Sequence, residues 1–384
     1  MVSCNVCGAP ATDLLYESAA ERSLTSNGQR VTGRTLVSFC GDCGHLQTQP
    51  ILALDEFYAH EYQIFSGHED EDLLYRIVDG QRIYRIDHQV NTLLAKLSLP
   101  VGARVLDYGC AKGHLLRKLL ARRPDLQVHA FDVSDSYKPF WDAFIPRENQ
   151  ASFTPPPEWD ARFDLVLSSF MLEHVPQPVT TLGTMARLLA PGGTLYGIVP
   201  NVYTNAADFL VVDHLNHFSR SSIERALRLS GLSSWEIDAQ SHQSAWIFSA
   251  AQRANHTTPP LTGDTIQTWE TQARELARHW RGYTERIRAL ESQHAVQRKL
   301  AIYGSGFYGT LLASSLAEPA QIECFIDRDP FRQGKQVLGH RVVAPEALPK
   351  DVSLVFVGLN PTLARAAISQ VSAFQGRPIE FLYP

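Results

Sequence analysis

Alternation of strands and helices is the feature that most limits how this chain can fold. Apolar runs predict strands at 103–110, 127–134, 163–175 and 190–200. Amphipathic stretches between them predict helices, among them 114–123. Strands that alternate with helices form a mostly parallel sheet covered on both faces. The sequence therefore predicts an α/β fold with a Rossmann-like central sheet.

A glycine turn of the form Asp-x-Gly-x-x-x-Gly follows the first of these strands. Its glycines, Gly109 and Gly113, let the backbone pass close to a ligand where strand meets helix. Asp132 lies at the carboxyl end of the second strand, where it is placed to accept hydrogen bonds from two ribose hydroxyls. Asp107 is either part of the same site or a strand-end cap. The turn alone is weak evidence, because dinucleotide sites use similar glycines.

The combination of motifs is more specific than the turn. FDVSD, FDLVLSSFMLEHV and LLAPGGTLYGIVPN follow it, and the stretch 103–201 resembles the class I methyltransferases, whose motifs occur in this order. That resemblance implies S-adenosylmethionine as cofactor, with the turn's aspartate and glycines around its methionine part and the second strand's aspartate at its ribose. It places Ser168 or Ser169 beside the sulfonium. Glu173 and His174 are either functional or a pair at a helix start.

Four cysteines form two Cys-x2-Cys pairs, Cys4/Cys7 and Cys40/Cys43, each followed by glycine. Four thiolates around one ion make a closed structural zinc site without an open position for substrate. His45 is a competing ligand, although four sulfurs already complete the shell. The alternative is four buried free cysteines. On the zinc interpretation, chelation loosens residues 1–50 without touching the chemistry directly.

A polar cluster follows the last predicted strand of the central sheet. The segment 201–227 contains Asp213, His214, Asn216 and His217 before an expected helix. Such groups are costly to bury without purpose, and a histidine at a strand exit is suited to general base catalysis near neutral pH. We favour a functional role for His214. For His217 the alternative of simple packing at the helix start stays open.

Nearly the whole chain resembles the three-domain sugar C-methyltransferases, which act on nucleotide-linked 4-keto-deoxyhexoses. The resemblance rests on CNVCG…FCGDCGHLQ, EYQIFSG (61–67), the cofactor motifs, DHLNHFS (213–219), IYGSGFYGTLL (302–312) and CFIDRDPFRQGKQVLG (324–339). It implies a zinc-binding module over residues 1–70, a methyltransferase domain over 71–255, and a long helix with a smaller Rossmann-like domain over 256–384.

The family resemblance also assigns roles to single residues. Such enzymes remove a proton beside the sugar ketone, and the enolate attacks the sulfonium methyl. By position, His214 matches the final histidine of the family's Tyr-His-Glu-His segment and Asp213 its glutamate. Tyr62 matches a tyrosine that helps to hold the sugar. Asn201 and His217 are expected at the substrate.

Two departures from the family pattern affect this interpretation. Val211 and Val212 stand where relatives carry the tyrosine and first histidine of that segment. Either Tyr203, His217 or His68 supplies the missing donors for an enolate, or the acceptor is a sugar hydroxyl, which needs only a base. We therefore expect C-methylation, with O-methylation as the alternative.

One long amphipathic helix is predicted after a Thr- and Pro-rich linker at 251–264. Apolar residues at spacings of three and four form its seam: Ile266, Trp269, Ala273, Leu276, Trp280, Tyr283, Ile287 and Leu290. We expect this seam to pack along its own chain; pairing with a second subunit is the alternative.

A second strand–helix pattern over 299–384 contains a complete Gly-x-Gly-x-x-Gly at Gly304, Gly306 and Gly309. Taken alone, it suggests a dinucleotide site and a nicotinamide-dependent oxidoreductase. The family resemblance implies instead a degenerate domain that holds the nucleotide sugar, with these glycines and Thr310 at the substrate. A third possibility is that the glycines serve only helix–sheet packing.

Charge and hydropathy exclude several classes of partner. A net charge of −5 without a dense Lys/Arg run gives no footprint for nucleic acid. The longest apolar runs are too short to span a membrane, and the N-terminus lacks the pattern of a signal peptide. We expect a cytoplasmic enzyme whose partner is a nucleotide sugar. The oligomeric state is left open.

Overall fold

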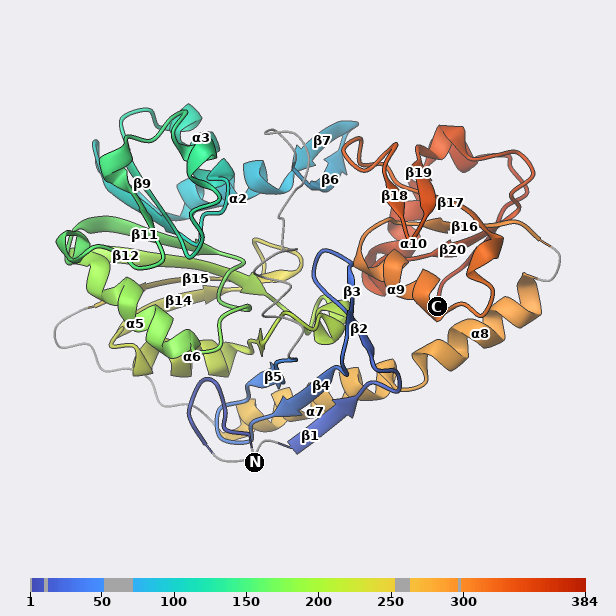
Figure 1. Cartoon of the computed structure of the whole chain (residues 1–384), viewed down its shortest axis with the longest axis horizontal. Coiled ribbons are helices and arrows are strands. Elements are labelled where there is room, and N and C mark those ends of the chain that lie inside the picture. Colours follow the sequence, from blue (N-terminus) through green and yellow to red (C-terminus); the bar gives the residue numbers. More distant parts are fainter. Residues whose placement is uncertain (1, 10–12, 52–71, 253–262, 296–297) are drawn as a thin grey trace. The chain divides into compact units, whose positions relative to one another are not determined.

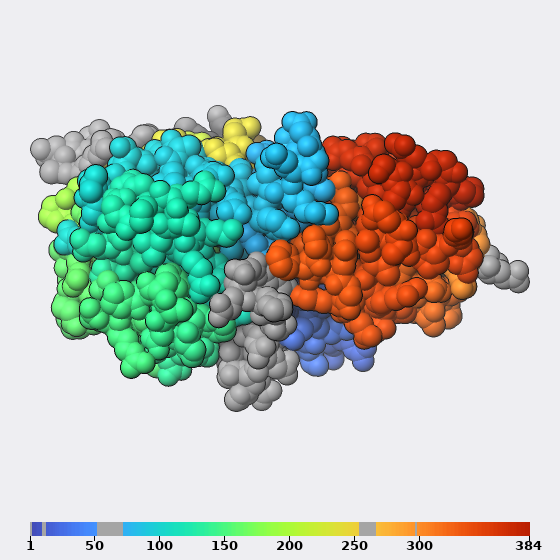
Figure 2. All heavy atoms as spheres, turned by 90° about the horizontal axis from the view of Figure 1, so that it is seen from above, coloured from blue at the N-terminus to red at the C-terminus, as the bar shows by residue number. Residues whose placement is uncertain are grey.

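The computed structural model describes the chain except residues 1, 10–12, 52–71, 253–262 and 296–297, which are grey in Figure 1 and Figure 2. The described residues form two compact units. The larger unit comprises Met1–Glu17, Leu36–Phe209 and Asp213–Arg274. The smaller unit comprises Ser18–Thr35, Leu210–Val212 and Glu275–Pro384. The predicted domain boundaries stay predictions.

A seven-stranded sheet forms the centre of the larger unit (Figure 1), in the order β10-β9-β8-β11-β12-β15-β14. The first five strands are parallel, and β15 is antiparallel to both its neighbours. The strands are β8 (Arg104–Tyr108), β9 (Gln127–Asp132), β10 (Gln150–Ser152), β11 (Phe163–Ser169), β12 (Leu189–Pro200), β14 (Ser234–Asp238) and β15 (Ala245–Ala251). The predicted α/β fold is confirmed, although β11 ends six residues earlier than expected, at Ser169.

Helices cover both faces of this sheet. They are α2 (Arg85–Lys96), α3 (His114–Arg122), the short α4 (Lys138–Trp141), α5 (Pro178–Leu188) and α6 (Arg220–Leu229). Leu93 of α2 and Leu119 of α3 belong to one hydrophobic cluster. Met185 of α5 and Ile223 of α6 belong to another. A hairpin of β6 (Leu74–Val78) and β7 (Gln81–Tyr84) precedes α2.

The cysteine-bearing N-terminal segment adds a four-stranded sheet to the larger unit, in the order β1-β4-β5-β13. Its strands are β1 (Asp13–Glu17), β4 (Leu36–Phe39), β5 (Leu46–Thr48) and β13 (Asn216–His217). In the antiparallel pair β5–β13, Asn216 lies opposite Gln47 and His217 opposite Leu46. A strand from the predicted polar cluster thus completes the N-terminal sheet. The sequence did not predict this pairing.

The smaller unit contains a six-stranded sheet, in the order β18-β19-β17-β16-β20-β21. Its strands are β16 (Leu300–Tyr303), β17 (Ile322–Ile326), β18 (Gln336–Val337), β19 (His340–Val343), β20 (Leu354–Val357) and β21 (Glu380–Leu382). All pairs except β18–β19 are parallel. The helices α9 (Phe307–Ser315) and α10 (Pro361–Ser369) and the hairpin β2–β3 (Arg22–Leu24 and Arg30–Thr32) belong to the same unit. The expected second Rossmann-like sheet is confirmed.

The predicted long helix is two helices. α7 (Gly263–Trp280) ends before Gly282, whose φ of +70° starts α8 (Tyr283–His294). The left-handed conformation of Gly282 interrupts the helix, which the spacing of the apolar seam does not reveal. The seam itself is buried at Ala273, Trp280 and Ile287.

Among the described residues, no helix combines the length and the apolar character that crossing a bilayer requires.

Candidate functional site

The predicted glycine turn joins β8 to α3. Gly109 has a φ of +82°, and a Cβ there would lie 2.5 Å from Cγ of Met171, so only glycine fits. The amides of Gly109 and Cys110 both donate to the Phe131 carbonyl, at 2.8 and 3.1 Å. Gly113 follows as the left-handed residue before α3. The turn is therefore fixed against the end of β9.

Two carboxyl groups lie at the ends of the adjacent strands β8 and β9. The Asp132 carboxylate accepts hydrogen bonds from the amides of Ala111 and Ser134, at 2.9 and 3.1 Å. Asp107 is 3% exposed. Burial, and then the charge of Asp132, raise the pKa of Asp107 to about 7. Burial also raises the pKa of Asp132. Both groups stand where a polar ligand over the turn would meet them.

Two hydroxyls at the end of β11 complete this loop region. The Oγ atoms of Ser168 and Ser169 are buried and have no hydrogen-bond partner among the described residues. Buried polar groups are normally satisfied, so these atoms fit a site that takes a ligand or water. The turn, the two carboxyl groups and the two hydroxyls thus suit the cofactor that the resemblance implies. The contact of each residue with it stays a prediction.

A buried carboxylate binds two of the predicted histidines. Asp208 lies in a short 3-10 helix, Ala206–Leu210, and its Oδ1 is 2.7 Å from Nδ1 of His214. Its Oδ2 is 2.9 Å from Nδ1 of His217. The side chains of Asp208 and His217 are 2% and 0% exposed, whereas that of His214 keeps 10% exposure. His214 is thus the member of this group best able to reach a substrate.

Charge coupling within the pair outweighs burial. Burial opposes the charged form of His214, but the charge and hydrogen bond of Asp208 raise its pKa to about 9. Burial likewise opposes the charged form of Asp208, yet the charge of His214 and the bonds from both histidines hold its pKa below the ordinary value. The pair therefore resembles the oriented carboxylate–histidine unit used in general base catalysis.

Glu173 and His174 lie beside His214. Each of the three residues places one ligand atom within 4.8 Å of the others, an arrangement that also suits a metal ion. Burial raises the pKa of Glu173 to about 8, and its Oε2 has no hydrogen-bond partner among the described residues. Since Met171, two residues earlier, packs at Gly109, the chain connects this cluster directly to the glycine turn.

The other predicted residues of this segment make contacts within the protein, and their expected roles stay predictions. The Asp213 carboxylate is 3.7 Å from Nδ1 of His174, whose ring nitrogen is also 3.0 Å from the Asp213 carbonyl. His217 uses its second ring nitrogen too, at 2.8 Å from the Thr48 hydroxyl. Neither nitrogen of His217 is left for a substrate. The Asn201 side chain accepts a hydrogen bond from the Tyr203 amide, at 3.1 Å.

Of the residues considered as replacement donors for an enolate, Tyr203 has a buried hydroxyl with no hydrogen-bond partner among the described residues. The Tyr203 ring packs on Trp269, at 4.8 Å between ring centroids. Tyr62 and His68 lie outside the described residues. The two valines that replace polar residues of the family belong to the smaller unit, where the Val212 amide donates to the Leu24 carbonyl at 3.0 Å.

The four cysteines come together as predicted. Sγ of Cys4 is 3.6 Å from Sγ of Cys43, and Sγ of Cys7 is 3.5 Å from Sγ of Cys40. Sulfurs about 2.3 Å from a central zinc ion are about 3.8 Å apart in a tetrahedron. The cluster is therefore compatible with zinc. The group of neighbouring ligand atoms does not include His45, whose Nε2 lies 3.2 Å from the Asn216 side-chain oxygen.

The glycine turn of the smaller unit is closely packed. A Cβ on Gly309 would lie 1.9 Å from the Gly304 carbonyl oxygen, and one on Gly304 would lie 2.5 Å from the Gly358 carbonyl oxygen. Gly306 has more room. The Thr310 hydroxyl donates to the Gly306 carbonyl at 3.1 Å. Helix–sheet packing alone explains the first and third glycines, and their predicted contact with substrate stays a prediction.

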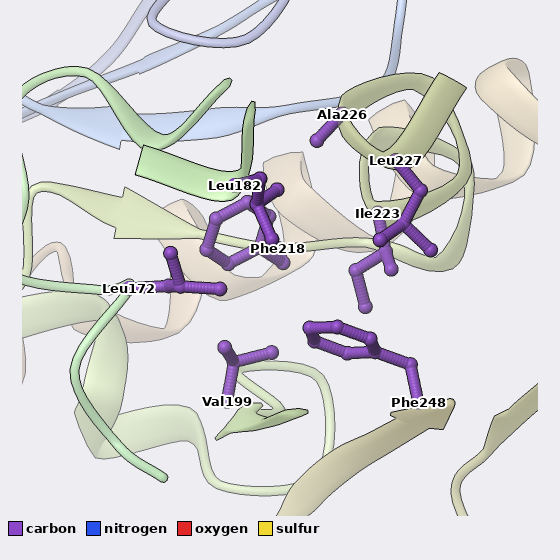
Figure 3. A pocket seen from close by; sticks show the side chains of 8 residues that line it. All are labelled: Leu172, Leu182, Val199, Phe218, Ile223, Ala226, Leu227 and Phe248. Atoms are coloured by element: carbon purple, nitrogen blue, oxygen red, sulfur yellow. The ribbon is translucent and has the colours of Figure 1, made fainter. Parts of the chain in front are cut away.

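One apolar pocket of the larger unit does not belong to this polar site. Figure 3 shows its eight lining side chains: Leu172, Leu182, Val199, Phe218, Ile223, Ala226, Leu227 and Phe248. None of them carries a titratable or hydrogen-bonding group. The pocket is a packing space between the central sheet and the helices α5 and α6.

Comparisons with known proteins agree with the cofactor part of the site. Residues 78–237 match a family model described as a methyltransferase domain. The chain is similar to a trans-aconitate 2-methyltransferase of Methylobacterium nodulans, at 27% identity over 211 residues, 51% of this chain and 70% of the relative. This part of the chain is an S-adenosylmethionine-dependent methyltransferase domain.

Other similarities to the methyltransferase domain are more local. A ubiquinone biosynthesis O-methyltransferase of Xanthomonas campestris is 35% identical over 115 residues, 28% of this chain and 47% of the relative. The chain thus spans about half the length of this relative. A solved S-adenosylmethionine-dependent methyltransferase from Mesorhizobium loti aligns with 43% of this chain and 99% of its own, at 19% identity and a TM-score of 0.35.

Sequence reasoning missed two members of the site. Asp208 precedes His214 by six residues, and nothing in the local pattern distinguishes it from a solvent-exposed aspartate. Thr48 is remote in sequence from His217, although both belong to short strands of one sheet. A search for carboxylates near the predicted histidines is the only sequence signal that could have found Asp208.

Proposed function

We propose that the protein transfers a methyl group from S-adenosylmethionine to a nucleotide-linked sugar, with His214 as the base. The observation that carries this proposal is the buried Asp208–His214 pair, 2.7 Å apart, in a cluster that the chain connects directly to the glycine turn of the methyltransferase domain. The sugar itself rests on the family resemblance of the sequence. The four-cysteine cluster and the second Rossmann-like sheet are consistent with that resemblance.

The chain's own residues suit base-assisted methyl transfer. A bound cofactor would supply an electrophilic methyl group and leave as S-adenosylhomocysteine. Asp208 holds Nδ1 of His214, so the opposite ring nitrogen is the atom that accepts the acceptor's proton. That proton leaves either a carbon beside a ketone or a hydroxyl, and the electron pair left behind forms the bond to the methyl carbon. Because the pKa of His214 is about 9 in the free protein, the rate should rise with pH.

One observation favours the alternative of O-methylation. The two valines that replace polar residues of the C-methyltransferase pattern are 5% and 0% exposed. They supply no donor for an enolate oxygen, whose stabilisation is worth roughly 3 kcal/mol per hydrogen bond. A hydroxyl acceptor needs no such donor. The name of the Xanthomonas relative also describes transfer to oxygen.

Full-length, zinc-loaded protein incubated with S-adenosylmethionine and a panel of nucleotide-linked sugars tests the proposal. Mass spectrometry should detect one added methyl group, and the carbon chemical shift of that group separates a C-methyl from a methoxy product. His214→Ala should keep cofactor affinity by calorimetry and lower turnover by roughly 10²–10⁴-fold. Tight cofactor binding without transfer to any sugar of the panel would contradict the proposal.

A further inference from the structure

A continuous chain of buried polar contacts connects the four-cysteine module to His214. Thr48 is the last residue of β5, five residues after Cys43, and it is 1% exposed. Its hydroxyl lies 2.8 Å from Nε2 of His217. Nδ1 of His217 lies 2.9 Å from one Asp208 oxygen, and the other oxygen is 2.7 Å from His214.

The chemistry of these groups fixes the direction of each hydrogen bond. A carboxylate only accepts, so both histidines donate to Asp208 through Nδ1. A neutral His217 then has an accepting Nε2, to which the Thr48 hydroxyl donates. This donation holds His217 in the tautomer that binds Asp208, as second-layer hydrogen bonds do for catalytic and metal-bound histidines.

The backbone holds Thr48 in place for this contact. β5 pairs with β13, and the Thr48 amide donates to the Leu215 carbonyl at 3.2 Å. The neighbouring Asn216 is held as well. Its side-chain oxygen accepts a hydrogen bond from His45, and its side-chain amide donates to the carbonyls of Leu172 and Val175. The pairing of β5 with β13 therefore keeps the Thr48 hydroxyl next to the His217 imidazole.

We infer that the four-cysteine module positions the catalytic base, with Thr48 and His217 as positioning residues that orient Asp208 toward His214. This inference rests on the proposed function of His214. It gives the module a part in catalysis beyond stabilising the fold, in contrast to the sequence-based expectation that chelation leaves the chemistry untouched. In this inference Thr48 and His217 act on His214 through Asp208.

Substitution of the hydroxyl tests the inference in the full-length, zinc-loaded protein. Thr48→Val keeps the shape of the side chain and should lower kcat at neutral pH at least fivefold, with unchanged affinity for S-adenosylhomocysteine. Thr48→Ser restores the hydroxyl and should return kcat to within twofold. Thr35→Val is the matched control, because Thr35 is 3% exposed and its hydroxyl pairs only with Ser23 in the described contacts.

A second readout does not depend on the sugar substrate. In ¹⁵N spectra of labelled histidines, loss of the Thr48 hydroxyl weakens the donation from His217, so the Asp208 carboxylate binds the His214 proton more strongly. The midpoint of the His214 titration should then move up by at least half a pH unit in Thr48→Val and not in Thr35→Val. The other groups that face His214 are Glu173, His174 and Asp213, and they are the same in all variants.

The outcomes separate the two proposals. If no sugar is methylated but the His214 titration moves in Thr48→Val, the proposed substrate is wrong and the positioning contact stands. A Thr48→Val variant with full zinc content, wild-type kcat and an unmoved titration overturns the inference. A loss of kcat that Thr48→Ser does not restore, or that Thr35→Val shares, also overturns it.

Discussion

Removal of the Asp208 charge is the most direct test of the site, because this carboxylate dominates the protonation of His214. The pKa of His214 lies at about 9 rather than 6.5, although burial alone acts in the opposite direction. The difference corresponds to about 3 kcal/mol between the charged and neutral imidazole. In Asp208→Asn burial remains and the main opposing charge is lost, so the pKa of His214 should fall below 6.5.

The amide also cannot reproduce both hydrogen bonds. It has one accepting oxygen, whereas His214 and His217 both donate to the carboxylate. One histidine must therefore change its tautomer or lose its partner. Turnover should fall by roughly 10²–10⁴-fold, the usual cost of losing a correctly oriented base.

The pH dependence of kcat/KM is the assay that distinguishes this reasoning from a general loss of structure. For the wild type, kcat/KM should rise with pH toward a plateau above about 9. For Asp208→Asn the plateau should be lower, and the midpoint of the rise should lie below pH 6.5. A variant that loses activity but keeps the wild-type midpoint would refute the assigned coupling between Asp208 and His214. Unchanged calorimetric binding of S-adenosylhomocysteine is the control for folding.

Stability of the wild type should follow the same pair. Because the pKa of His214 is raised on folding, its stabilising contribution is complete below pH 6.5 and is lost as the pH rises through about 9. Urea unfolding at pH 6 and 10 should show this loss as a lower free energy of unfolding at pH 10, relative to Asp208→Asn. Asp132→Ala should weaken cofactor binding by roughly 10–100-fold, since hydrogen bonds to a charged group contribute about 1.5–3 kcal/mol. Calorimetry with S-adenosylhomocysteine measures this affinity. An unchanged affinity would argue against a contact between Asp132 and the cofactor ribose. Metal analysis of protein purified without chelators should find one zinc per chain, and replacement of the four cysteines should remove it. A second equivalent of metal that survives this replacement and is lost in Glu173→Gln would place a metal at Glu173, His174 and His214. Gly309→Ala should destabilise the smaller unit by about 1–3 kcal/mol or more, because the new Cβ would lie 1.9 Å from a carbonyl oxygen. Gly306→Ala is the matched control. A raised KM in Gly306→Ala without a change in the free energy of unfolding would indicate that the turn holds the substrate.

The sequence predicted those parts of the molecule that follow from local pattern. The alternation of strands and helices gave the central sheet, and the glycine turn placed Gly109, Gly113 and Asp132 at one edge of it. These features can be predicted because the local backbone pattern determines the strands and the turn. The carboxyl ends of neighbouring parallel strands then lie at the same edge of the sheet. The paired Cys-x2-Cys spacing was equally sufficient, because two such turns form one thiolate cluster.

Local pattern also had clear limits. The helical seam continued through Gly282 without a break in its spacing, so one helix was expected where two occur. Periodicity reports which face of a helix is apolar and does not report a left-handed residue at its surface. The Gly-x-Gly-x-x-Gly of the smaller unit was ambiguous for the same reason, since close packing of helix on strand and approach to a phosphate both require a missing Cβ.

The least predictable part of the site is the support of His214, and its physical basis explains why. Histidines and acids near the cofactor strands were recognisable by residue type, but the useful carboxylate proved to be Asp208, whereas Asp213 turns toward His174. Which acid pairs with which histidine depends on a two-residue strand, β13, whose partner β5 lies in the cysteine-bearing segment. A strand of two residues has no periodicity to detect, and its register is set by a tertiary contact. If that contact positions the base, an intact four-cysteine cluster and the proposed activity of His214 should be lost or kept together. Partial zinc depletion, followed by parallel measurement of kcat and of cofactor affinity, tests this. We expect kcat to fall with zinc content while the affinity of the remaining folded protein stays constant.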